Sequence, residues 1–166
     1  MQPLVLFAHG QESGPRGGKI RHLAGIAEQR GCRVSSLDYQ GIASADERVD
    51  YLLSHDLGPY SKLIMVGSSM GGYVSAVASR TLQPDGLFLM APAINLPGYQ
   101  ERNPRAAAKV ICVVFGWQDE AIPVAHGIRF AQMMQARMHI LPSNHRLLNV
   151  LPLVGDLFDL FLRDVL

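Results

Sequence analysis

The sequence predicts an α/β fold, a three-layer sandwich around a doubly wound, mostly parallel sheet of about six strands. Three observations lead to this prediction. Short apolar runs alternate with longer amphipathic segments along the whole chain. The short runs are mostly rich in Val, Ile, Leu or Phe, as is typical of strands covered by helices on both faces. The length of 166 residues is that of one domain, so residues 1–166 are expected to form a single domain.

Six strands and five helices are expected, alternating except between residues 90 and 110, where a non-periodic segment joins two strands. The strands are predicted at residues 4–8, 33–37, 62–66, 86–90, 110–115 and 138–141. Helices are predicted between them at residues 18–30, 45–57, 70–81 and 124–136, and a last helix follows His145. Because each connection between strands is long enough to cross over the sheet, this order favours parallel pairing.

The last helix carries one apolar stripe. Its members are spaced by four and three residues and comprise Leu147, Leu151, Val154, Phe158, Phe161 and Val165, with Leu148, Leu157 and Leu160 widening it. Packing of this stripe on the sheet is the expectation. A homodimer contact and a membrane-surface helix are the alternatives, and Pro152 disfavours a straight surface helix.

Composition and charge exclude several classes of protein. Fifteen basic and fourteen acidic side chains give a net charge of +1, without a basic run dense enough to bind nucleic acid. No uninterrupted apolar stretch reaches about 18 residues, and residues 1–8 lack the features of a signal peptide. Cys32 and Cys112 are expected to be two reduced, buried thiols. These features predict a cytoplasmic protein without a membrane or nucleic-acid partner.

Residues 67–71 combine a G-x-S-x-G pattern with a preceding strand and a following helix. In such a turn the central residue, here Ser69, is held in a strained conformation with its hydroxyl above the sheet. Gly67 and Gly71 are expected because larger side chains there would collide with neighbouring backbone, and Gly72 allows close helix packing. The simpler interpretation is a flexible turn in which Ser69 caps a helix. The context favours Ser69 as a nucleophile.

A nucleophilic serine needs a base, and the chain offers six histidines: His9, His22, His55, His126, His139 and His145. Three of them, His22, His55 and His126, fall inside predicted helices, and His139 falls inside a strand. His145 comes just after the carboxyl end of the last strand, the edge of an open α/β sheet where sites form. His145 is therefore the predicted base. The alternative is that it caps a helix or is an ordinary surface histidine.

The base in turn needs a carboxylate to hold its tautomer, and Asp119 is the predicted one. It follows the penultimate strand, whereas Glu120 fits the first turn of the next helix and remains a weaker candidate. Asp38 and Asp85 are weaker rivals. The resulting chain order, serine then aspartate then histidine, is that expected for this type of sheet.

Two backbone N–H groups are predicted to stabilise a developing oxyanion. One belongs to Met70, directly after the nucleophile, and the other to Gln11 in the loop after the first strand, where Gly10 lets the backbone turn. His9 is expected to support that loop, the alternative being an ordinary strand exit. Residues 14–19 lack the Walker and dinucleotide patterns and are expected to lead into the first helix. No cofactor and no metal are predicted, because no His, Cys, Asp and Glu cluster has ligand spacing.

These segments together resemble the α/β-hydrolase superfamily over nearly the whole chain, and among its members the small bacterial serine esterases without a cap. Residues 7–10 resemble its oxyanion strand exit, 67–72 its nucleophile elbow, 116–119 its acid loop and 144–147 its histidine loop. The resemblance implies catalytic roles for Ser69, Asp119 and His145. It also implies a strand order 4-3-5-6-7-8 in the family's numbering, with the chain starting at the third strand, and a lid reduced to residues 91–105.

The expected activity is hydrolysis of small carboxylic esters through an acyl-enzyme. Thioester, amide or acyl-transfer chemistry with the same residues is the second hypothesis, and a non-catalytic binding protein is the third. The expected partner is a small acyl substrate, with a homodimer left open. An apolar rim is predicted from Met70, Pro92, Ile94, Ile122 and Pro123, and a substrate-binding surface from His9, Gly10, Ile94 and Ile122.

Overall fold

The computed structural model describes all residues from 1 to 166, and its centre is one sheet of six parallel strands in the order β2-β1-β3-β4-β5-β6. The strands are β1 (Leu4–Ala8), β2 (Arg33–Ser36), β3 (Leu63–Ser68), β4 (Gly86–Met90), β5 (Val110–Gln118) and β6 (Arg137–Asn144). If the first strand is counted as the family's third, this is the order 4-3-5-6-7-8. The predicted α/β fold and its sheet topology are confirmed.

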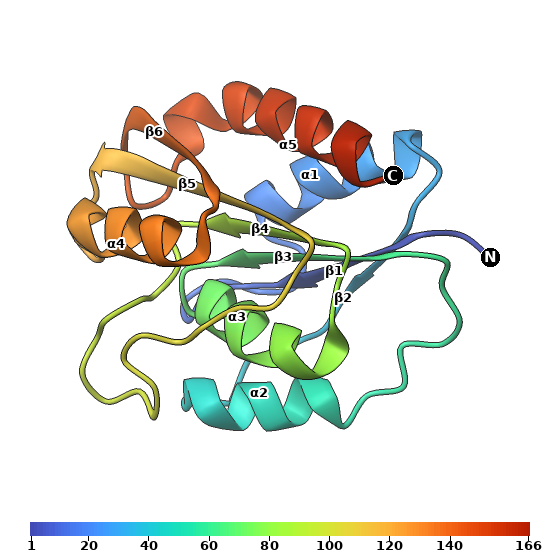
Figure 1. Ribbon diagram of the computed structural model, residues 1–166, viewed down its shortest axis with the longest axis horizontal. Coiled ribbons are helices and arrows are strands. Elements are labelled where there is room, and N and C mark those ends of the chain that lie inside the picture. The colour runs from blue at the N-terminus through green and yellow to red at the C-terminus, as the bar shows by residue number, and fades with distance from the viewer.

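Five α-helices cover the sheet on both faces (Figure 1). They are α1 (Gly18–Gln29), α2 (Ala45–Leu53), α3 (Met70–Leu82), α4 (Val124–Met134) and α5 (Leu151–Val165), the last preceded by a 3-10 turn at Leu148–Val150. Helices α2, α3 and α4 pack on one face, and α1 and α5 pack on the other. The carboxyl ends of the strands gather at one edge, at the left of Figure 1.

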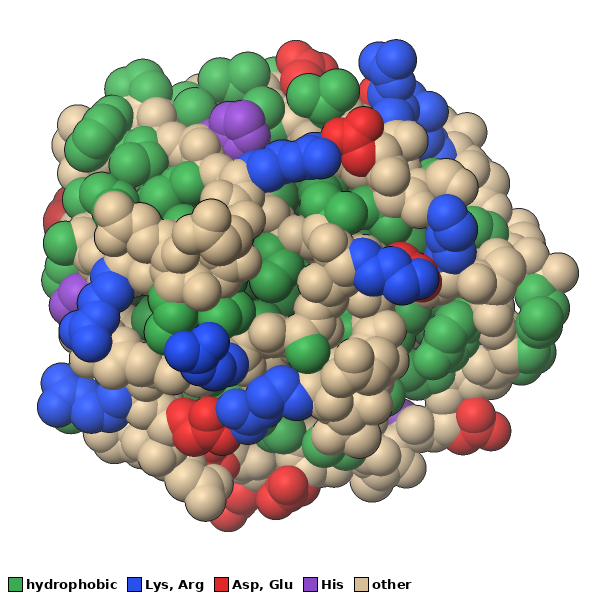
Figure 2. Space-filling model, in the orientation of Figure 1, with side chains coloured by type: hydrophobic (Ala, Val, Ile, Leu, Met, Phe, Trp, Pro, Cys, Tyr) green, Lys and Arg blue, Asp and Glu red, His purple; other side chains and the backbone are tan.

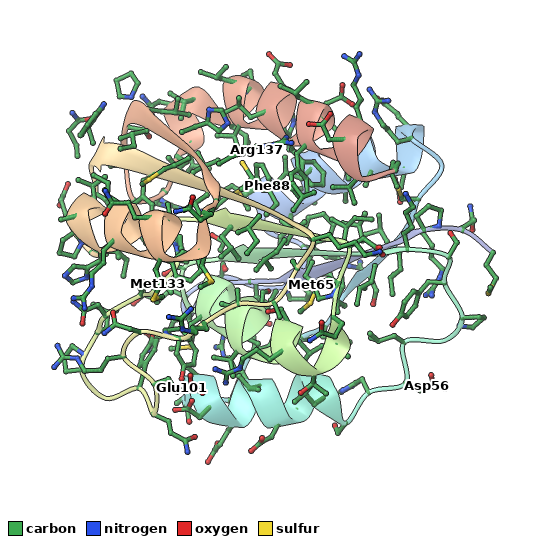
Figure 3. The ribbon with its side chains drawn as sticks, in the orientation of Figure 1. Asp56, Met65, Phe88, Glu101, Met133 and Arg137 are labelled. Carbon is green, nitrogen blue, oxygen red and sulfur yellow. The ribbon has the colours of Figure 1, made fainter.

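Alternating side chains of each strand divide the core into two layers. Figure 3 labels one member of each: Met65 of β3 points to the side of α2 and α3, and Phe88 of β4 points to α5. The ring centroid of Phe88 lies 5.1 Å from that of Phe158 and 5.4 Å from that of Phe161. The predicted stripe of the last helix therefore packs on the sheet.

Two side chains predicted to widen that stripe lie outside the core. Leu160 is 49% exposed because it lies on the flank of α5 turned away from the sheet, and Leu148, which belongs to the 3-10 turn before α5, is 45% exposed. On the face seen in Figure 2, basic and acidic side chains lie interspersed among apolar ones.

No helix has the length and apolar character needed to cross a membrane. Cys32 and Cys112 are buried and are not bonded to each other.

The main differences from the predicted boundaries lie at the site edge. Strands β5 and β6 continue to Gln118 and Asn144, where these two residues pair across a register shift. Residues 142–144 lie beyond the predicted end of the last strand, but pairing to β5 keeps them extended. Helix α2 ends at Leu53, four residues early, since the side chains of Ser54 and His55 both contact the carbonyl of Tyr51. The longer strands bring Asp119, which follows β5, and His145, which follows β6, close together at the carboxyl edge of the sheet.

Candidate active site

Ser69 stands alone between the end of β3 and the start of α3. Its backbone has φ 54° and ψ −117°, a combination that L-residues rarely adopt. Hydrogen bonds hold it there: its N–H donates to the Met90 carbonyl at 3.0 Å, and its carbonyl accepts from Ala93 N at 2.9 Å and Gly72 N at 2.9 Å. The predicted strain is thus present. The Ser69 hydroxyl forms no helix cap, which excludes the simpler interpretation.

The glycines on either side of Ser69 are required by close backbone approach. A Cβ atom on Gly67 would overlap with the backbone of Gly71 and Gly72, and one on Gly71 would overlap with the carbonyl groups of Ala8 and His9. The turn therefore lies directly against the end of β1. This contact ties the position of Ser69 to the loop that follows β1.

His145 lies directly after β6 and reaches the serine. Its Nε2 atom is 3.0 Å from Ser69 Oγ, and its Nδ1 atom is 2.8 Å from Asp119 Oδ2. The imidazole therefore lies between a hydroxyl and a carboxylate, each within hydrogen-bond distance of a different ring nitrogen. The three residues come from the ends of three strands.

Asp119 is held in place by its own loop. Its side chain is completely buried, and Oδ1 accepts hydrogen bonds from Ala121 N at 2.9 Å and Ile122 N at 2.8 Å. Two backbone donors and one imidazole N–H thus stabilise the ionised carboxylate.

The competing carboxylates lie elsewhere. Glu120 is exposed and has no hydrogen bond to His145. Asp38 accepts from Gln40 N, and Asp85 is bonded to Leu63 N and Lys109 at the opposite end of the sheet. Among the acidic residues considered, only Asp119 contacts the histidine.

Comparison with solved structures yields a match over the full chain. A protein of Xanthomonas campestris pv. campestris, described as a candidate hydrolase of the alpha/beta superfamily, superposes with a TM-score of 0.86 at 29% identity, covering 99% of each chain. The chain belongs to the α/β-hydrolase superfamily.

Esterases are among the more distant structures with the same fold. The α/β-hydrolase fold of this chain matches an esterase of Pyrococcus furiosus with a TM-score of 0.82 at 15% identity, covering 99% of this chain and 83% of that one. The protein Est1E of Butyrivibrio proteoclasticus matches with a TM-score of 0.77 at 16% identity, over 98% and 88%. Comparison with family models finds no match, and comparison with curated proteins finds none either.

Two backbone N–H groups of this α/β-hydrolase have no acceptor in the protein. Met70 is the first residue of α3, so its N–H has no partner within the helix. Gln11 N donates to no protein group, whereas the neighbouring Gly10 N donates to Ser13 Oγ at 3.0 Å. Both positions predicted for an oxyanion site therefore carry a free donor.

His9 is buried beneath the loop that carries Gln11. Its Nε2 atom accepts a hydrogen bond from Tyr39 N at 2.9 Å, so the proton lies on Nδ1, which donates to the Gly10 carbonyl at 2.7 Å. Burial lowers the pKa of His9 and favours this neutral form. The guanidinium of Arg48, also buried, donates to the same Gly10 carbonyl at 3.2 Å. His9 therefore supports the loop. Arg48 supports it too, and no sequence pattern predicts this role.

A cavity of about 610 Å³ opens beside Ser69. This volume suits a small molecule. Most of the side chains that line it are polar or charged. The β1 loop and the start of α1 contribute His9, Gly10, Gln11, Ser13 and Lys19, and other loops contribute Ser69, His145 and Arg146. Of the predicted substrate-binding residues, His9 and Gly10 lie on this cavity.

The prediction that Ile94 and Ile122 form an apolar rim requires correction. They are 1% and 2% exposed, belong to the core on the α3 side, and do not line the cavity. Met70, Pro92 and Pro123 do not line it either. The hydrogen bond from Ile122 N to Asp119 places Ile122 in the loop beneath the carboxylate. The cavity opens toward the polar start of α1, and its apolar members are Ile20, Ala121 and Leu148.

Gly71→Ala is expected to lower the free energy of unfolding by about 3 kcal/mol or more, because the added methyl group meets rigid backbone. Gly25→Ala, inside α1 with open space around it, is the matched control and should raise stability by about 0.5–1 kcal/mol. Urea unfolding followed by circular dichroism measures both. Equal stability of the two variants would contradict the close approach at Gly71.

Proposed function

We propose that this protein is a serine hydrolase that cleaves carboxylic esters of small molecules, with Ser69 as nucleophile, His145 as base and Asp119 as the residue that orients the base. The observation that carries the proposal is the position of the His145 ring, 3.0 Å from Ser69 Oγ and 2.8 Å from Asp119 Oδ2. The esterases among proteins of the same fold support the choice of an ester bond.

In the first half of the reaction, Ser69 Oγ attacks the ester carbonyl carbon while its proton passes to His145 Nε2. The tetrahedral intermediate collapses as the bond to the alcohol oxygen breaks. The proton on Nε2 moves to that oxygen, and a neutral alcohol leaves an acyl group on Ser69. Asp119 stabilises the imidazolium that exists between these two transfers.

In the second half, a water molecule gives its proton to Nε2 and attacks the acyl carbon. The bond to Ser69 Oγ breaks, and Oγ takes the proton back. A carboxylic acid is released and the starting state returns. In both halves the free N–H groups of Met70 and Gln11 are the proposed donors to the oxyanion, and His9 acts as a positioning residue for the loop that carries Gln11.

A fluorophosphonate probe tests the nucleophile directly. Labelling of the protein is expected at Ser69, located by mass spectrometry of peptides, because the probe reacts only with an activated serine. Ser61→Ala, which removes an exposed serine away from the site, is the control and should label at the wild-type rate. Absence of labelling at Ser69 in the folded protein would favour a non-catalytic binding protein.

The class of bond is tested with one acyl group presented in three forms. We expect a butyrate ester to be hydrolysed with the highest kcat/KM, ahead of the matched thioester and anilide. A higher value for the thioester or the anilide would assign the same residues to thioesterase or amidase chemistry. Transfer of the acyl group to added alcohols in place of water would indicate an acyltransferase.

A further inference from the structure

Two positively charged side chains line the cavity beside Ser69. Lys19 comes from the first turn of α1, and Arg146 directly follows His145. Neither has a carboxylate within ion-pair distance, and neither side chain donates a hydrogen bond to the protein. Lys19 and Arg146 are far apart in the sequence, and the fold brings them to the same cavity.

Four other cations of this protein have a carboxylate partner. Arg30 is paired with Asp159, Arg80 with Glu101, Arg137 with Asp164 and Lys109 with Asp85. Most of the fifteen Lys and Arg side chains, including Lys19 and Arg146, form no such pair. What distinguishes Lys19 and Arg146 is that both line the cavity beside Ser69.

Lys19 is also partly removed from water. It is half-buried, and burial, followed by the positive charge of Arg146, lowers its pKa to about 8, while the negative charge of Asp119 acts in the opposite direction. A cation in such surroundings lowers the stability of the fold unless an anion reaches it. Glu12 also lines the cavity, but it is exposed and forms no ion pair with either cation.

The backbone at the start of α1 adds donors to the same wall. The first turn contains no acidic side chain, and no side chain caps it. The N–H groups of Gly18, Lys19 and Ile20 therefore remain free, at the positive end of the helix dipole. Gly18, Lys19 and Ile20 all belong to the cavity lining.

We infer that the substrate is an ester that carries a carboxylate on the same small molecule, and that Lys19 and Arg146 bind this carboxylate beside the reacting ester. The inference rests on the proposed function, since it places the ester at Ser69. A neutral ester would leave both cations unpaired within the cavity, whereas a carboxylate would pair with them. Arg146 offers a planar fork that suits a carboxylate, and Lys19 adds a point charge.

Two pairs of probe esters, each differing by one charge, test the inference. In the first pair, 4-acetoxybenzoate is compared with its methyl ester, so that the charge lies on the alcohol side. In the second, 4-nitrophenyl hydrogen glutarate is compared with 4-nitrophenyl methyl glutarate, so that it lies on the acyl side. We expect the anionic member of at least one pair to have a KM lower by about tenfold, with non-enzymatic hydrolysis subtracted.

Charge-removing variants connect that preference to the two side chains. Lys19→Gln and Arg146→Gln are each expected to reduce the ratio of kcat/KM for the anionic ester to that for its neutral partner by about threefold, since the two cations share the tenfold preference. The matched controls are Lys109→Gln, at the far end of the sheet, and Arg129→Gln, an exposed residue of α4; both should keep the wild-type ratio. The melting temperature of Lys19→Gln should rise, because a half-buried unpaired cation is removed, whereas a merely structural lysine would give a decrease.

The pH dependence supplies an independent readout. Lys19 is charged below its pKa of about 8 and neutral above it, so KM for the anionic ester should increase between pH 7 and pH 9 relative to its neutral partner. The other titratable groups facing this part of the cavity are His9, Glu12, Asp119, His145 and Arg146, and their effects on catalysis are shared by both esters. Lys19→Arg keeps its charge throughout and should abolish the increase.

The outcomes separate this inference from the proposed function. If Ser69 is labelled and neutral esters are hydrolysed, but neither pair shows a preference for the anion, the carboxylate subsite is wrong and the hydrolase assignment stands. If neither pair is hydrolysed and Ser69 is not labelled, the proposed function itself fails. A preference that survives both Lys19→Gln and Arg146→Gln would also overturn the inference.

Discussion

Ser69→Ala is expected to lower kcat/KM for ester hydrolysis by about 10⁴-fold or more, equivalent to about 5.5 kcal/mol of transition-state stabilisation. The substitution removes the atom that would form the acyl bond and leaves His145 without its partner at 3.0 Å. Residual hydrolysis would depend on the free N–H groups and substrate binding alone. Steady-state rates with a short-chain 4-nitrophenyl ester measure the loss. Activity within tenfold of wild type would exclude Ser69 as the nucleophile.

The same position offers a stability measurement that is independent of activity. Ser69→Ala should change the free energy of unfolding by less than about 1 kcal/mol, because the hydroxyl is partly exposed and has only His145 as a partner. Ser69→Gly should be more stable than Ser69→Ala by about 1 kcal/mol, since glycine adopts φ 54° without steric strain. Urea unfolding of both variants tests whether strain is stored at this turn. A glycine variant less stable than the alanine variant would contradict it.

Asp119→Asn is expected to reduce kcat by about 10³–10⁴-fold with little change in structure. The N–H groups of Ala121 and Ile122 donate to Oδ1, so the amide oxygen of the asparagine would occupy that position. The amide NH₂ would then face His145 Nδ1 and donate to it. Nδ1 would become the acceptor and Nε2 would carry the proton, so Nε2 could no longer accept the proton of Ser69.

Glu120→Gln is the matched control for Asp119→Asn, because it removes the neighbouring carboxylate, which is exposed and does not contact His145. Its kcat should stay within about twofold of wild type, since an exposed charge has a small effect. Circular dichroism spectra of both variants verify that they are folded. A loss larger for Glu120→Gln than for Asp119→Asn would reverse the roles assigned to the two residues.

The site residues were predicted from the positions of strand ends, and this explains why three of the predicted side chains meet and why two others do not lie at the cavity. Ser69, Asp119 and His145 each follow a strand, and parallel strands end at one edge, so their meeting could be expected from order alone. The apolar character of Ile94 and Ile122 and their position near the same edge predict a rim. Their burial in the core shows that position along the chain does not decide the direction in which a loop side chain points.

Lys19 and Arg146 illustrate the reverse case. In the sequence, Lys19 belongs to a glycine-rich segment without a recognised pattern, and Arg146 is one basic residue beside a histidine. Their placement in the same cavity depends on how α1 starts and how the loop after β6 turns. Neither feature has a local sequence signal strong enough to predict it.

Local patterns are enough to predict the alternation of strands and helices, the parallel sheet and the three residues after its strands, because hydrophobic periodicity and turn glycines act locally. They do not predict the 3.0 Å and 2.8 Å distances around His145, the neutral state of His9 or the charged side chains that line the cavity. Those features arise from contacts between segments distant in the chain, and such contacts depend on packing of the complete core.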